Sequence, residues 1–125
     1  MPHTEGFAAT FAALRAILEP HAKRLTVTVD EPGHFELASP TMTDRAGRPL
    51  FFAAVKINKN YVSYHFLPVY ANTALRNSLS PALRKRMQGK SCFNFTTVEP
   101  GQIKELAAIT KKGIAGFKKL NLPWA

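Results

Sequence analysis

Two apolar segments joined by a short asparagine-rich turn constrain this fold more than any other feature of the sequence. Residues 50–57 (LFFAAVKI) and 61–67 (YVSYHFL) flank Asn58-Lys59-Asn60. The pattern is typical of a β-hairpin, because asparagine tolerates the positive φ of tight turns. A two-residue turn at Asn58-Lys59 predicts one buried face, formed by Phe51, Ala53, Val55, Val62, Tyr64 and Phe66.

Apolar periodicity places the other elements. Helices are expected through Phe7, Phe11, Leu14 and Leu18 as far as Pro20, after Pro68 in two short segments, and from Pro100 onwards. The inner stripe of the last helix is expected to contain Ile103, Leu106, Ala107, Thr110, Ile114 and Phe117. Strands are expected at residues 25–29, 34–38 and 91–96, with a polar loop at 39–49.

Residues with strong end preferences mark the expected limits of the helices. Thr4 is a candidate N-cap of the first helix, and Asn72 and Ser80 are candidate N-caps of the two short ones. Pro81 suits the first position of a helix, and Gly89 suits its C-terminal end.

The predicted element order is α-β-β-β-β-α-α-β-α. One long hairpin without βαβ alternation indicates an α+β fold in a single domain, residues 1–125. We expect a mostly antiparallel sheet of about five strands, with the terminal helices packed on one face.

Charge and cysteine content indicate a compartment and a class of partner. Seventeen Lys and Arg against eight Asp and Glu give a net charge of +9, which favours acidic partners. The single cysteine, Cys92, excludes an intrachain disulfide and fits a reducing cytoplasm. The N-terminus lacks a basic signal-peptide region, and no uncharged run approaches about 18 residues. The sequence therefore predicts a cytoplasmic protein with no membrane partner.

Strand alternation predicts a polar face on the sheet. If the aromatic and aliphatic residues of the strands point into the core, the opposite face carries His34, Glu36, Lys56, Tyr61, Ser63, His65, Cys92 and Asn94. These residue types include nucleophiles, bases and metal ligands, so the face is a candidate pocket. The alternative is a solvated sheet face, which antiparallel sheets commonly have.

Two smaller groups on this face have chemical interpretations of their own. His34 and Glu36 lie on the same side of one strand and are candidate metal ligands. A zinc deaminase also contains a His-x-Glu sequence, but it needs a Pro-Cys-x-x-Cys sequence as well, which this chain lacks. Cys92 and His65 are a candidate thiol–imidazole pair for nucleophilic catalysis. The alternative for Cys92 is a small buried hydrophobe.

Basic residues cluster in two places. Arg84, Lys85, Arg86 and Lys90 surround Met87, and five lysines lie along the last helix, Lys104, Lys111, Lys112, Lys118 and Lys119. Both clusters suit phosphate groups, and both also suit a solvated helix face. No RNA-binding aromatic motif or recognition helix accompanies them, so specific nucleic-acid binding is not favoured.

The run from Leu79 to Phe95 (LSPALRKRMQGKSCFNF), with FFAAVKINKNYVSYHFLPVY before it, resembles the YdhG-like family of small bacterial domains of unknown function. The resemblance extends over most of the chain, and Met87–Phe95 is its most specific part. It implies an α+β fold, a bacterial cytoplasmic protein and no established enzyme activity. One branch of the family is described as a frataxin-like intracellular iron chaperone. Such iron delivery relies on exposed carboxylates, of which this chain has few, so no iron ligands are assigned.

The sequence thus favours a small non-catalytic module without a cofactor, which binds an anionic small molecule or polyanion. Its expected ligand-binding residues are Lys56, Tyr61, His65, Arg84, Arg86, Lys90, Cys92 and Asn94. Frataxin-like iron or metal handling is the first alternative, and a thiol-dependent enzyme is the second.

Overall fold

Six antiparallel strands form one sheet in the computed structural model, which describes residues 2–71, 73–89 and 91–117. The strands are β1 (Thr26–Glu31), β2 (His34–Thr43), β3 (Pro49–Ile57), β4 (Val62–Phe66), β5 (Met87–Gln88) and β6 (Cys92–Phe95). Their order across the sheet is β1-β2-β3-β4-β6-β5, and every neighbouring pair is antiparallel. The predicted α+β fold is confirmed. The sixth strand is β5, which has only two residues and no periodicity that the sequence could reveal.

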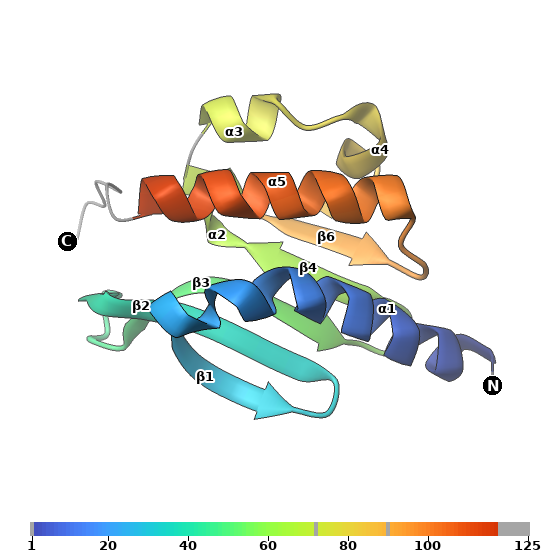
Figure 1. The fold of residues 1–125 in the computed structure, drawn as a ribbon, viewed down its shortest axis with the longest axis horizontal. Coiled ribbons are helices and arrows are strands. Elements are labelled where there is room, and N and C mark those ends of the chain that lie inside the picture. The colour runs from blue at the N-terminus through green and yellow to red at the C-terminus, as the bar shows by residue number, and fades with distance from the viewer. Residues whose placement is uncertain (1, 72, 90, 118–125) are drawn as a thin grey trace.

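Two long helices, α1 (Pro2–Leu18) and α5 (Pro100–Phe117), lie side by side over one face of the sheet (Figure 1). The shorter helices are the 3₁₀ helix η1 (Glu19–Arg24), α2 (Leu67–Ala71), α3 (Thr73–Asn77) and α4 (Pro81–Arg84). The predicted apolar stripe of α1 is buried, with Leu14 and Leu18 fully inaccessible. The packing of both terminal helices on one face is therefore confirmed.

The helix ends differ from the prediction in detail. Because α1 begins at Pro2, Thr4 lies within its first turn and is not its N-cap. The α-helix ends at Leu18, and helical structure continues past Pro20 as the 3₁₀ helix η1, in which this proline occupies one of the first two positions. Asn72 lies outside the described residues, so its predicted capping role is not tested.

The hairpin of β3 and β4 has a longer turn than the sequence predicts. The Asn58 N–H donates to the Tyr61 carbonyl at 2.8 Å, and residues 58–61 connect the strands. As a result Ala53 pairs with Phe66 and Val55 with Tyr64. The two-residue turn expected from the sequence would pair Ala53 with Tyr64 and Val55 with Val62, so the observed register is shifted by two residues. A shift of two leaves each side chain on its predicted face, because side-chain direction alternates with a period of two.

A bulge in β3 moves one predicted core residue to the opposite face. The pairing of β2 with β3 is irregular next to Ala38, and Phe52 is the extra residue. Phe52 is fully buried, with its ring edge-on to that of Phe66 at 5.3 Å. Phe51 is only half-buried and lies against the His65 ring at 6.4 Å. The prediction that Phe51 belongs to the core is therefore wrong.

Two polar segments also differ from the prediction. Residues 39–43, predicted as loop, extend β2 to Thr43, and the buried Ser39 hydroxyl accepts the Met42 N–H at 2.8 Å. Gly89 does not end a helix. The helix α4 ends at Arg84, and Gly89, with φ +78°, lies in the turn between β5 and β6.

Ser80 caps α4 as predicted and also ties this helix to α5. Its hydroxyl accepts the Leu83 N–H at 3.3 Å and donates to a Glu105 carboxylate oxygen at 2.5 Å. The buried stripe of α5 is rotated from the predicted one, because Ala107 is exposed and Ile109 is buried. The side chain of Phe117 lies outside the described residues.

Candidate functional site

Cross-strand pairing brings the predicted polar residues together on the sheet face opposite α1 and α5. The antiparallel registers form one row of His34, Lys56, Ser63 and Asn94, and a second row of Glu36, Ala54, His65 and Cys92. The strands that carry these residues are therefore neighbours, as a shared site requires. Tyr61 is the exception, because it lies in the turn between β3 and β4.

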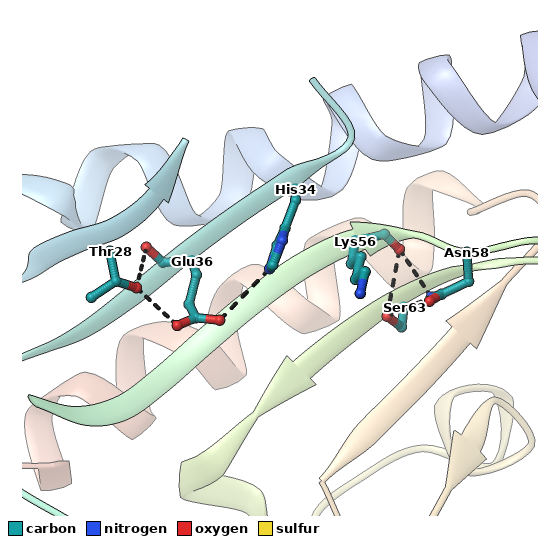
Figure 2. A network of polar contacts seen from close by, with 6 residues as sticks. All are labelled: Thr28, His34, Glu36, Lys56, Asn58 and Ser63. Atoms are coloured by element: carbon teal, nitrogen blue, oxygen red, sulfur yellow. Dashed lines mark hydrogen bonds and ion pairs between the residues drawn. The ribbon is translucent and has the colours of Figure 1, made fainter. Parts of the chain in front are cut away.

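Figure 2 shows two hydrogen-bonded groups on this face. In the first, Glu36 is held between its neighbours. The Thr28 hydroxyl donates to one Glu36 carboxylate oxygen at 2.9 Å, and His34 Nε2 lies 3.6 Å from the other. The two candidate metal ligands thus contact each other. Among the described side chains, no group of three His, Cys, Asp or Glu is arranged to hold a metal ion.

The second group fixes the end of the hairpin near Lys56. Asn58 Nδ2 donates to the Ser63 hydroxyl at 3.0 Å and to the Lys56 carbonyl at 3.3 Å. The Lys56 side chain is exposed, and within the described part of the chain no carboxylate lies within ion-pair distance of its ammonium group. Lys56 is therefore a cation available to a ligand on this face.

The sheet also brings Cys92 and His65 into contact, with Sγ 3.6 Å from Nε2. The thiol donates to the Asn94 side-chain oxygen at 3.3 Å. Burial raises the pKa of the Cys92 thiol, and burial followed by the positive charge of Lys56 lowers the pKa of His65. Both pKa shifts favour a neutral thiol beside a neutral imidazole. A thiol-dependent enzyme needs the other form of the pair, a thiolate beside an imidazolium.

Slow alkylation of Cys92 at neutral pH follows from these pKa shifts. Because the thiolate is the reacting form, we expect iodoacetamide to label the folded protein more slowly than the urea-unfolded protein at pH 8. The labelling rate of the folded protein should continue to rise above pH 9. Rapid labelling at pH 7 that is lost in His65→Ala would instead demonstrate an activated thiolate.

In the predicted basic segment, Arg84 is held by backbone carbonyls and lies near a second arginine, Arg76. Arg84 Nε donates to the Leu79 carbonyl at 3.2 Å and its NH2 group donates to the Asn77 carbonyl at 3.0 Å. Arg76 NH1 lies 3.4 Å from the Tyr70 carbonyl. The two arginines line one cavity of about 290 Å³. Arg76 was not predicted as a site residue, because it precedes the basic segment by eight positions and carries no motif of its own.

Arg86, another residue of the basic segment, lies beside β6 of the sheet. The Arg86 carbonyl accepts the Asn94 N–H at 2.8 Å, so Arg86 is next to the strand that carries Cys92. The side chains of Lys85 and Arg86 are exposed. Lys90, Lys118 and Lys119 fall outside the described residues.

In comparisons with known proteins, no family model, no curated protein and no solved structure matches this chain. The resemblance to the YdhG-like family stays a prediction. Among the helices of the described part, none has the length and apolar character needed to cross a membrane.

Proposed function

We propose that this protein is a small non-catalytic binding module of the bacterial cytoplasm, and that its ligand is a small anion held by Arg76 and Arg84. The observation that carries the proposal is that two arginines, Arg76 and Arg84, line one cavity of about 290 Å³. Arginine binds carboxylate and phosphate groups with paired N–H donors, so two arginines on one cavity favour a ligand with such groups.

The geometry of the cavity supports this proposal in two ways. Both guanidinium groups donate to backbone carbonyls, which restricts their movement before a ligand arrives. Within the described residues, neither group has a carboxylate within ion-pair distance. Each guanidinium has further N–H donors beyond those bonded to carbonyls, and these remain for an anion.

Calorimetric titration with inorganic pyrophosphate tests the proposed function. We expect Arg76→Gln/Arg84→Gln to bind pyrophosphate at least about tenfold more weakly, because each charge-assisted hydrogen bond contributes roughly 1.5–3 kcal/mol. The matched control is Lys104→Gln/Lys112→Gln, which removes two exposed lysines of α5 that do not line this cavity. It should bind pyrophosphate nearly as well as the natural chain.

Two results would contradict the proposed site. Equal loss in both double variants would mean that pyrophosphate senses only the diffuse positive charge. If the natural chain does not bind pyrophosphate at low ionic strength, the proposed anion site does not exist. Thermal unfolding of each variant separates these results from a loss of the fold.

Iron handling, the alternative that the family resemblance implies, has a separate test. Titration with ferrous iron under anaerobic conditions should give no micromolar site, because the His34–Glu36 pair lacks a third ligand among the described side chains. A stoichiometric tight site that disappears in His34→Ala/Glu36→Ala would favour this alternative over anion binding.

A further inference from the structure

A groove lies at the end of the molecule where η1, the end of β2 and the last turns of α5 meet. The C-terminal halves of α1 and α5 point to this same end in Figure 1. Two adjoining cavities form the groove, of about 320 Å³ and about 450 Å³, and they share Arg24, Ile114 and Ala115. Together they have the size of a small-molecule site. None of their lining residues belongs to the arginine cavity or to the polar sheet face.

The groove combines an apolar floor with a cationic rim. Leu25, Met42 and Ile114 line it and are half-buried against the core. Lys23 and Lys111 line its other side and are exposed. Such a surface fits a molecule with one apolar and one charged end, because the two ends would meet separate parts of the groove.

Acidic side chains are absent from the described lining of the groove. Among the described residues that line the two cavities, none is Asp or Glu. Glu19, the acidic residue of η1, lies 3.5 Å from Arg15 outside the groove. The pKa of His21, which also lines the groove, is lowered by burial and then by the positive charges of Arg24 and Lys111. A bound anion would relieve this repulsion between like charges.

Helix dipoles do not account for the whole rim. Cations near the C-terminus of a helix are favoured, but the effect falls off within the last turn. Lys111 lies six positions before Phe117, where α5 ends, and is therefore more than one turn from the helix end. The helix dipole therefore does not explain a lysine at position 111, whereas a ligand in the groove would.

We propose that this groove binds a small amphiphilic anion, a carboxylate with a linear apolar chain. The carboxylate contacts Lys23, Arg24 and Lys111, and the chain lies on Leu25, Met42 and Ile114. The ligand class follows from charge complementarity at the rim together with the apolar floor. The site is independent of the arginine cavity, so its test does not depend on pyrophosphate binding.

Calorimetric titration of the full chain with acetate, hexanoate and octanoate tests the proposal. We expect no measurable binding of acetate and roughly fourfold tighter binding for each methylene that the groove buries. The neutral alcohol 1-octanol should bind at least about tenfold more weakly than octanoate, since it lacks the charged group. Lys23→Ala/Lys111→Ala should weaken octanoate binding by a similar factor.

The control variant is Lys104→Ala/Lys112→Ala, which removes two exposed lysines outside the groove. It should bind octanoate like the natural chain. Equal affinity for acetate and octanoate, or equal loss in the two double variants, would overturn the proposal. Binding to anionic phospholipid vesicles without binding to monomeric octanoate would also overturn it, since the occupant would then be a membrane surface.

Discussion

Phe66→Ala is expected to lower the free energy of unfolding by about 3–5 kcal/mol, the usual loss for a phenylalanine removed from a packed core. Phe66 is fully buried, and its ring lies 5.3 Å from that of Phe52 and 6.1 Å from that of Tyr64. It also lies beneath α5, where Gly113 approaches it. Truncation would therefore open a cavity between the sheet and the helix. Urea unfolding at equilibrium measures the loss.

Phe51→Ala is the matched control, because it deletes the same atoms from the same hairpin. The ring of Phe51 is half-exposed on the polar face, so its removal is expected to cost less than half as much. Equal losses would show that the bulge in β3 is absent and that Phe51 also belongs to the core. A loss below about 1 kcal/mol for Phe66→Ala would contradict the predicted burial itself.

The comparison of these two phenylalanines shows what the sequence can predict about the sheet. Alternation predicts which residues share a face wherever the strand is regular, and it succeeds for Phe66 despite the wrong register. It fails at Phe51 and Phe52, because a bulge inserts one residue and reverses the alternation beyond it. Two adjacent phenylalanines give no indication of which one points inward.

For the candidate site too, the sequence predicts some neighbours and not others. Alternation alone predicts that Lys56, His65 and Cys92 share a face, and the antiparallel pairing of their strands keeps them on one side of the sheet. The partnership of Arg76 with Arg84 was not predictable, because it depends on the path of the chain through α3 and α4. Short helices joined by turns leave no periodicity from which such a path can be derived.

Five of the eight carboxylate side chains take part in local contacts away from the cation-lined cavities. Glu19 and Asp30 both contact Arg15, and Glu36 contacts His34. Asp44 is occupied by the turn before β3, where its side chain accepts the Ala46 and Arg48 N–H groups. Glu105 binds the cap of α4. None of these five acids lines the arginine cavity or either cavity of the groove.

Gly113→Ala is expected to destabilise the protein by about 1–3 kcal/mol, although alanine favours a helix by about 1 kcal/mol over glycine. A methyl group at Gly113 would lie 2.9 Å from Pro68 Cβ and 2.8 Å from Phe66 Cε2, and would also overlap Phe66 Cζ. Both neighbours are buried, so they have little room to move. Close packing of α5 on the sheet therefore requires glycine at this position.

Gly116→Ala provides the comparison, because no described atom outside its local backbone lies within 4 Å of a methyl group there. It should be neutral or stabilise the fold by up to about 1 kcal/mol, through helix propensity alone. The Phe66→Ala background completes the test. Removing the ring makes space for the new methyl group, so Gly113→Ala should cost less in that background than in the natural chain. Additive effects of the two substitutions would show that Gly113 does not pack against Phe66, and would place α5 differently over the sheet.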